Sequence, residues 1–473
     1  MTSSQNFALG ITSKVIPPTR ILALVLCFLA LACFARAQQT QSVPQDDAAA
    51  RVAWHKSMKQ TPLPKHGCFT VSYPNTAWQE SSCTTAPNIP FVPKSGPLPQ
   101  TVGGGNDFAA EATSGLISSA EGSFPNAGGM TGESGYVKNQ PPAYSNSFSL
   151  QLNSEYFYNT PLCASAATPS QCQGWQQFLF TEGNGGIGYV YIQYWLLNYG
   201  DNCPSNWTLD IVAYEPNCYL NSTSVNVPAQ QAVDLPFMTL TGEASASTDT
   251  VIFTAPGDNL SAVGQDSVLN LDQQWTQAEF NVVGDASGGE ANFNSGSTLV
   301  VQTSLNNGTT NAPQCLGAQG AGTTGETNNL NLIPQSLPVC CPYGGTSPSI
   351  QFLESNASGA TATCGANGLE NNMATAPYST NGSETRILYP IILGEIRVEY
   401  SAKLENNTPG ATIAYQLFDA CGDSLGGATV SSGTTISYLD TEINGEPCTY
   451  GIRGTMDATA PGYVPGLSSG IAF

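Results

Sequence analysis

The chain has 473 residues, which suggests two or three domains at about 150 residues each. Only 10% of the residues are charged, and acidic residues outnumber basic ones 34 to 13. Nucleic acids are excluded as partners, because binding phosphates requires Lys and Arg to replace counterions, whereas a hydrophobic content of 41% is sufficient for a folded core.

Residues 1–37 are predicted to be a secretory signal peptide. Lys14 and Arg20 precede an apolar run at 21–34, and Ala35-Arg36-Ala37 forms a small-x-small cleavage site. The run is too short for a comfortable membrane span, and no later stretch is apolar for long enough. We therefore expect a secreted, extracellular protein (periplasmic in a Gram-negative host) with no membrane partner.

The cysteines that follow the signal are predicted to form disulfides. They are even in number and lack a repeated CxxC, which is typical of an oxidising compartment. Local pairing predicts Cys68–Cys83, Cys163–Cys172, Cys203–Cys218 and Cys421–Cys448. The pairing of four others stays open: Cys315, Cys340, Cys341 and Cys364. Structural zinc is the competing interpretation, but the chain offers only His55 and His66, so we expect no metal and no cofactor.

Residues 38–101 are rich in proline and carry half of the cations that follow the signal, together with both histidines. This segment is predicted to be either a pro-segment or a plain N-terminal extension. In the first case its basic part, residues 38–66, would be attracted to the acidic remainder of the chain and would cover a binding groove until acid releases it.

Residues 139–385 contain no Lys, Arg or His. A Ser-His-Asp triad, a Cys-His pair, a Schiff-base lysine and a phosphate clamp are all excluded there, because each needs one of these residues. Any catalysis in this region has to use carboxylates, amides, hydroxyls and backbone dipoles. Few carboxylates would lose a cationic partner on protonation, so an acidic working environment is expected.

Short segments rich in Val, Ile, Tyr, Phe and Thr, separated by Gly, Asn, Ser and Asp, predict an all-β fold. We expect a concanavalin-like or jelly-roll antiparallel β-sandwich over 102–305, a disulfide-pinned insertion or linker over 306–385, and a small C-terminal β-sandwich over 386–473. The expected strands are 115–124, 146–153, 174–182, 187–199, 236–244, 248–255, 274–284 and 297–304.

Alternation along three of these strands predicts one face of aromatic rings, amides and a carboxylate. If the strands share a sheet, the face would form a groove suited to substrate binding, although Tyr and Trp also simply favour half-exposed strands. The predicted lining residues are Trp175, Tyr191, Gln193, Trp195, Trp275, Gln277 and Asn281, with Gln177 and Glu279 among them.

The run from Trp275 to Gly284, followed by residues 291–301, resembles the catalytic hairpin of the glutamic peptidases called eqolisins. Pieces at 120–125, 147–153, 172–178 and 194–195 follow in the order of that family, and the resemblance covers roughly 105–305. It implies that Glu279 is the catalytic glutamate. The family's glutamine corresponds to Gln176 or Gln177, and Gln177 is preferred because it shares a face with Trp175. Gly284 replaces a second glutamate of the family motif.

The resemblance implies a secreted acid endopeptidase acting on polypeptides. Glu279 would activate water as general base and Gln177 would stabilise the oxyanion, on adjacent strands with converging side chains. The alternative is a non-catalytic, adhesin-like protein that binds polysaccharide in the same groove. Residues 284–290, with Asp285 and Glu290, could hold calcium, but a glycine-rich hairpin turn is the better prediction.

Overall fold

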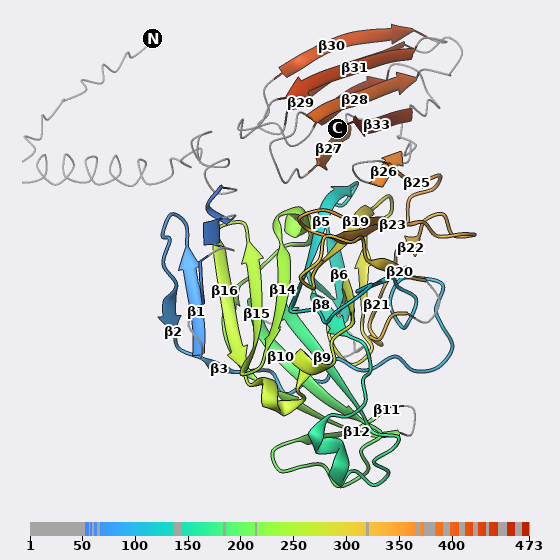
Figure 1. Cartoon of the computed structure of the whole chain (residues 1–473). Helices are drawn as coiled ribbons and strands as arrows, with labels where there is room; N and C mark the ends of the chain where they lie inside the picture. Colours follow the sequence, from blue (N-terminus) through green and yellow to red (C-terminus); the bar gives the residue numbers. More distant parts are fainter. Residues whose placement is uncertain are drawn as a thin grey trace, which may run out of the picture. The chain divides into compact units, whose positions relative to one another are not determined.

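The computed structural model describes residues 53–55, 57–58, 61–63, 67–136, 143–182, 186–212, 215–317, 321–365 and 369–372, and the backbone of seven strands beyond residue 383. Residues 1–37, Cys421 and Cys448 lie outside these described residues. The described part is almost entirely strand and turn, with only short helical turns, so the all-β prediction is confirmed (Figure 1).

Two large antiparallel sheets form the sandwich. The first sheet contains, in order, β2 (Gln79–Ser81), β1 (Gly67–Ser72), β16 (Asp258–Gly264), β15 (Thr248–Ala255), β14 (Thr239–Ser245), β5 (Ser119–Gly128), β19 (Thr298–Asn306) and β24 (Ser349–Ser355), with β22 (Asn331–Leu332) and β23 (Cys340–Tyr343) paired to β24.

The second sheet carries the predicted site strands. Its order is β11 (Thr208–Val212), β12 (Glu215–Asn221), β10 (Ile187–Leu197), β9 (Gln173–Thr181), β8 (Phe148–Ser154), β17 (Gln277–Gly284), β4 (Ala109–Glu111) and β20 (Gln314–Leu316), while β13 (Thr223–Pro228) pairs with β10 and with β3 (Thr84–Thr85).

Smaller elements complete the described chain. One minor sheet joins β21 (Thr327–Asn328), β18 (Glu290–Phe293), β6 (Glu133–Tyr136) and β7 (Ala143–Ser145), and another joins β25 (Thr361–Cys364) and β26 (Leu369–Asn372). The short 3-10 turns are η2 (Pro161–Ser165), η3 (Ala232–Phe237), η4 (Asp266–Val268) and η5 (Leu271–Gln273).

Large apolar side chains fill the space between the two sheets. Phe180 of β9 stacks on Phe253 of β15 with ring centroids 4.2 Å apart, and Phe280 of β17 lies 5.1 Å from Phe124 of β5. The sheets approach closely because β5 carries glycine opposite Phe280: a Cβ on Gly122 would lie 2.0 Å from that ring. Phe280 therefore requires glycine at this position.

The segment 306–385, predicted to be a disulfide-pinned insertion or linker, contains two disulfides and also contributes to the sheets. It supplies β20 to β26, and Ile350 and Phe352 of β24 are buried in the main core. The alternation of residues 349–355 was present in the sequence but was masked by the loop-like composition on either side of it.

The C-terminal strands form two hydrogen-bonded groups. One contains β27 (Glu384–Pro390), β32 (Ile452–Ala458), β29 (Thr412–Asp419) and β30 (Ser424–Ser431), and it continues the first large sheet because β27 pairs with β5. The other contains β31 (Thr435–Glu442), β28 (Val398–Glu405) and β33 (Gly466–Ala472). Their side chains lie outside the described residues. A separate C-terminal sandwich therefore stays a prediction.

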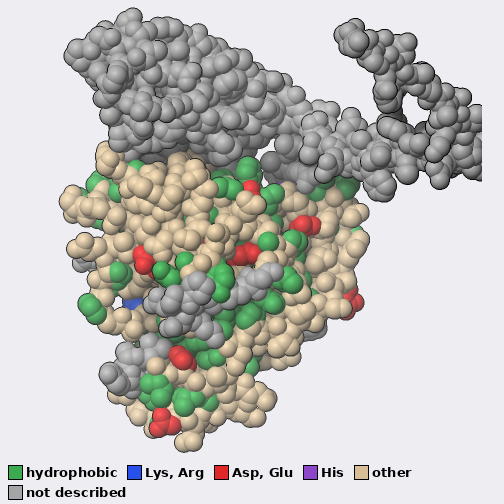
Figure 2. All heavy atoms as spheres, turned by 180° about the vertical axis from the view of Figure 1, so that it is seen from behind, with side chains coloured by type: hydrophobic (Ala, Val, Ile, Leu, Met, Phe, Trp, Pro, Cys, Tyr) green, Lys and Arg blue, Asp and Glu red, His purple; other side chains and the backbone are tan. Residues whose placement is uncertain are grey.

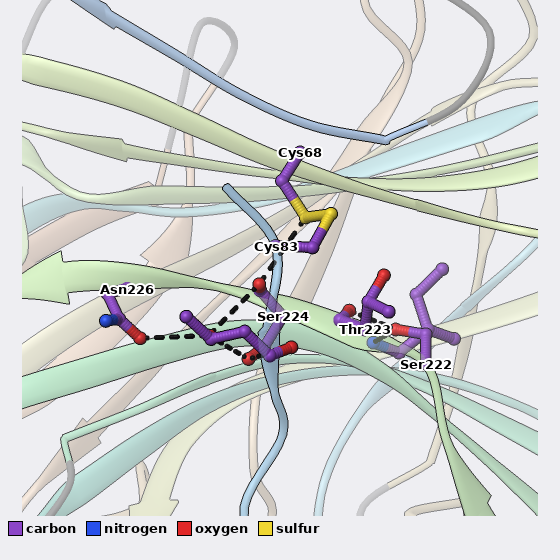
Figure 3. Close-up of a disulfide and its surroundings, with 8 residues drawn as sticks. Cys68, Cys83, Ser222, Thr223, Ser224 and Asn226 are labelled. Carbon is purple, nitrogen blue, oxygen red and sulfur yellow. Dashed lines mark hydrogen bonds between the residues drawn. A yellow bond between two sulfur atoms is a disulfide. The ribbon is translucent and has the colours of Figure 1, made fainter. Parts of the chain in front are cut away.

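Three of the predicted disulfides are confirmed: Cys68–Cys83, Cys163–Cys172 and Cys203–Cys218. The cysteines left open pair as Cys315–Cys340 and Cys341–Cys364. Figure 3 shows the Cys68–Cys83 bond beside Ser224 of β13. The carbonyl of Ser224 accepts a hydrogen bond from the Thr84 hydroxyl at 3.2 Å. Because Cys68 belongs to β1 and Cys83 precedes β3, this bond links the two large sheets.

Candidate functional site

Polar side chains form one row across the outer face of the second sheet. Asn221, Gln193, Gln177, Asn153 and Glu279 are successive cross-strand partners on β12, β10, β9, β8 and β17. Direct cross-strand partners point to the same face of a sheet. The register therefore brings Glu279 and Gln177 onto one face, as alternation predicted.

Glu279 and Gln177 are not on adjacent strands, because β8 lies between β17 and β9. Two strand spacings separate their backbones by about 9–10 Å. The Nε2 of Gln177 donates to Oε1 of Gln151 at 3.2 Å, whereas the amide that reaches Glu279 is Asn153, with Nδ2 3.4 Å from Oε2. The prediction that Glu279 and Gln177 lie on adjacent strands with converging side chains is therefore wrong.

The predicted groove is covered in the structure, so it is not open to solvent. Trp175, Tyr191, Gln193 and Trp195 are fully buried, and Asn281 is nearly so. Trp195 donates from Nε1 to the side-chain oxygens of Gln177 and Gln193, at 3.1 and 3.0 Å. The aromatic and amide side chains therefore form one buried network.

Residues 86–94, from the N-terminal arm, form the first covering segment. Phe91 is fully buried in a cluster with Leu179 and Tyr191. The backbone N–H of Phe91 donates to Gln193 Oε1 at 2.8 Å, and Gln193 Nε2 donates to the carbonyl of Ile89 at 3.0 Å. This segment therefore satisfies the polar side chains of the sheet with its own backbone.

Residues 321–326 form the second covering segment, over Glu279. The backbone N–H of Thr323 lies 2.7 Å from Glu279 Oε2, and its hydroxyl Oγ1 lies 2.6 Å from the same oxygen. Backbone hydrogen bonds also connect the two covering segments. The N–H of Lys94 donates to the carbonyl of Thr323 at 2.8 Å, and the N–H of Gly325 donates to the carbonyl of Val92 at 2.7 Å.

Residues 86–94 cover the site, whereas the cover predicted from charge was the basic part of the arm, residues 38–66. Trp54 and Met58 of the basic part instead pack on Val71 of β1, and His55 Nδ1 lies 3.2 Å from Asn259 Oδ1 on β16. The contacts over the site are apolar and backbone-mediated, which a count of cations cannot detect.

Burial raises the pKa of Glu279, whereas hydrogen bonds from Thr323 and Asn153 and the charge of Lys94 oppose that rise. Glu279 is 2% exposed, and its Oε1 has no hydrogen-bond partner among the described residues. The site therefore holds a desolvated carboxyl group with one oxygen engaged by Thr323 and the other unengaged.

Three further buried carboxyl groups surround this site, and sequence reasoning missed them. They are Asp107, Glu326 and Glu354. Asn281 lies between two of them: its Nδ2 donates to Asp107 Oδ2 at 2.9 Å and to Glu354 Oε2 at 3.2 Å. Burial and the charges of Glu279 and Glu354 raise the pKa of Asp107, and burial raises that of Glu354 to about 8. Glu326 and Glu354 belong to the segment 306–385, which was predicted to be an insertion or linker, and for that reason they were not considered as site residues.

Two other predicted groove residues lie elsewhere. Trp275 precedes the first residue of β17, so the alternation of that strand does not extend to it, and its ring packs in the main core 5.6 Å from Phe178. Gln277 lies at the partly exposed start of β17, where Nε2 donates to Glu111 Oε1 at 3.3 Å.

Within the described residues, no group of three or more His, Cys, Asp and Glu side chains is arranged to hold a metal ion. Asp285, a member of the possible calcium loop, accepts a hydrogen bond from Thr181. The described part of the chain also contains no helix long and apolar enough to cross a membrane. The charged side chains of the described surface are sparse, and in Figure 2 the acidic ones outnumber the basic ones.

No family model and no curated protein matches the chain. Among solved structures, it is similar to an exo-beta-1,3-galactanase from Phanerochaete chrysosporium bound to beta-1,3-galactotriose, with 9% identity, a TM-score of 0.13, and coverage of 63% of this chain and 78% of that one. The same enzyme with galactose gives 10% identity, a TM-score of 0.12, and coverage of 63% and 93%. Similarity at this level carries no argument about function.

Proposed function

We propose that the chain is a secreted acid endopeptidase of the glutamic type, held closed by residues 86–94 and 321–326. The observation that carries the proposal is the hydroxyl of Thr323, 2.6 Å from Glu279 Oε2. An attacking water would take this position once the covering segment leaves. A buried carboxylate at hydrogen-bond distance from the nucleophile's proton meets the geometric requirement for a general base.

In the proposed reaction, Glu279 takes a proton from water as the water attacks a peptide carbonyl, and returns a proton to the leaving amine. Removal of the cover would hydrate Glu279 and lower its pKa towards the ordinary range, so that the carboxylate is ionised at mildly acidic pH. The side-chain amide of Asn153, which lies 3.4 Å from Glu279 Oε2, would donate to the oxyanion in place of Gln177, whose Nε2 donates to Gln151 Oε1.

The polysaccharide-binding alternative depends on aromatic rings that sugars can reach. Trp175, Tyr191 and Trp195 are buried beneath the covering segments and would be reached only after the displacement that the peptidase proposal also requires, and Trp275 is part of the core. Nothing comparable to the contact between Thr323 and Glu279 favours stacking on sugar rings.

Hydrolysis of a denatured protein, assayed from pH 3 to 7 with the full chain, tests the proposal. We expect acid-dependent turnover that resists chelators and serine or cysteine traps, and that is lost in Glu279→Gln. Glu121→Gln is the matched control, because Glu121 lies on β5 of the other sheet and accepts from Thr241. Turnover that persists in Glu279→Gln, or glycan binding without proteolysis by wild type, would overturn the proposal.

A further inference from the structure

The contact between Thr323 and Glu279 places a nucleophile, a base and a peptide nitrogen together. The hydroxyl oxygen and the backbone nitrogen of Thr323 lie 2.6 and 2.7 Å from one carboxylate oxygen, Glu279 Oε2. That oxygen is therefore within reach of the proton that a nucleophilic hydroxyl must lose and of the nitrogen that a leaving amide must protonate.

The hydroxyl is also held in a defined orientation. Trp175 Nε1 donates to Thr323 Oγ1 at 3.1 Å, and of the two acceptors within reach of the hydroxyl, Glu279 Oε2 at 2.6 Å is much nearer than the Ser154 carbonyl at 3.4 Å. A hydroxyl oxygen has two lone pairs, so one remains after the Trp175 contact. The carbonyl of Thr323 is fixed by donors from Lys94 and Tyr156.

Glycine precedes Thr323, and the space beside it is narrow. A Cβ on Gly322 would lie 2.8 Å from Glu279 Oε1 and 3.1 Å from the Cβ of Asp107. The Gly322–Thr323 peptide is therefore buried and packed directly against the carboxyl group.

We propose that the chain cleaves its own Gly322–Thr323 bond. Thr323 Oγ1 attacks the Gly322 carbonyl carbon as Glu279 takes the hydroxyl proton. The C–N bond then breaks and Glu279 delivers that proton to the Thr323 nitrogen, leaving an ester between Gly322 and Thr323 Oγ1. Water hydrolyses the ester, releasing the Gly322 carboxylate and regenerating the Thr323 hydroxyl.

Cleavage would change the electrostatics of the site. The new Thr323 ammonium group would lie beside Glu279, whose pKa the charge of Lys94 already lowers. The fragment that ends at Gly322 would no longer be anchored to Thr323. The inference uses Glu279 as the base of the proposed function, but it does not require cleavage of other proteins.

The disulfides allow a direct test, because Cys315–Cys340 spans the scissile bond. We expect the full chain, incubated between pH 4 and 7, to migrate as one species without reductant and as two fragments after reduction. The smaller fragment should begin at Thr323, and the unreduced chain should gain the mass of one water. Hydroxylamine should accelerate cleavage of the wild type and leave a hydroxamate on Gly322, because it attacks esters.

Variants separate this chemistry from ordinary proteolysis. Thr323→Val and Glu279→Gln should slow cleavage by at least about 10²-fold, the lower range for loss of a general base. Thr323→Ser should retain cleavage, and so should the matched control Thr324→Ala, whose hydroxyl donates to Glu326. Circular dichroism checks that each variant is folded.

Three outcomes would overturn the inference: an intact chain after reduction with no hydroxylamine-sensitive ester in folded wild type, unchanged cleavage in Thr323→Val, or cleavage at another bond. An uncleaved chain that still hydrolyses denatured protein would reject self-cleavage alone. Self-cleavage without hydrolysis of added protein would reject the proposed peptidase function alone.

Discussion

The backbone N–H of Phe91 donates to the side-chain oxygen of Gln193 at 2.8 Å, so the polar face that carries Glu279 is capped by the chain's own backbone. The Phe91 ring adds apolar contact with Leu179 and Tyr191. Hydrogen bonds inside a buried network are costly to leave unmade. The covering segment is therefore a packed part of the fold.

Phe91→Ala should destabilise the protein by about 3–5 kcal/mol, the usual cost of removing a buried phenylalanine ring, and should loosen residues 86–94 selectively. Hydrogen exchange at the amide of residue 91 is expected to accelerate more than exchange in the core strands. Phe253→Ala, which removes an equally buried ring between the sheets, is the control. Equal local acceleration in both variants would show that the segment opens only by global unfolding.

Much of this arrangement could be predicted from period-2 alternation. The faces of β9, β10 and β17 follow it, and Gln177 therefore shares a face with Glu279. Strand order could not be predicted, because alternation does not specify which strands are neighbours. For that reason Asn153, the amide between Gln177 and Glu279, was overlooked. The covering segments were hidden for a different reason: neither residues 86–94 nor residues 321–326 show a strand pattern.

Stability should fall as the pH rises from about 4.5 to about 8. Burial raises the pKa of Glu133 and of Glu354 from 4.5 to about 8, and that of Glu182 to about 7. Below pH 4.5 these groups are protonated in both states. Above it the unfolded chain releases protons that the folded chain retains, so unfolding becomes more favourable. The melting temperature should therefore be higher at pH 4 than at pH 8.

Glu182→Gln tests one contributor to that slope. Glu182 Oε2 accepts from the backbone of Gln230 at 2.9 Å, and a glutamine oxygen can replace it without titrating. Denaturant titrations should show a smaller loss of stability between pH 4.5 and 7 than in wild type. An unchanged slope would mean that Glu182 has an ordinary pKa in the folded chain.

Removing the charge of Lys94 should raise the pKa of Glu279 further, because the positive charge of Lys94 lowers it. Carboxyl titration by infrared difference spectroscopy, with Glu279→Gln as the reference, would follow the group directly. Lys94→Gln should move the Glu279 titration to higher pH, whereas Lys94→Arg should leave it in place. The same displacement in both variants would attribute the effect to altered packing of residue 94, since only the first removes the charge.

Loss of the Cys68–Cys83 disulfide should free the start of the covering segment. The bond closes a loop with a sequence separation of 15, for which chain-entropy arguments give about 3 kcal/mol of stabilisation. It also holds β1 of the first sheet to the chain that enters β3 and continues into residues 86–94. The double variant Cys68→Ser, Cys83→Ser should therefore lose about 3 kcal/mol and become sensitive to proteases near residues 84–94.

Removing Cys203–Cys218, which closes a loop of the same separation between β10 and β12, is the matched control. It should cost a similar amount of stability while leaving residues 84–94 protected, and equal protease sensitivity there would contradict the assigned role of Cys68–Cys83.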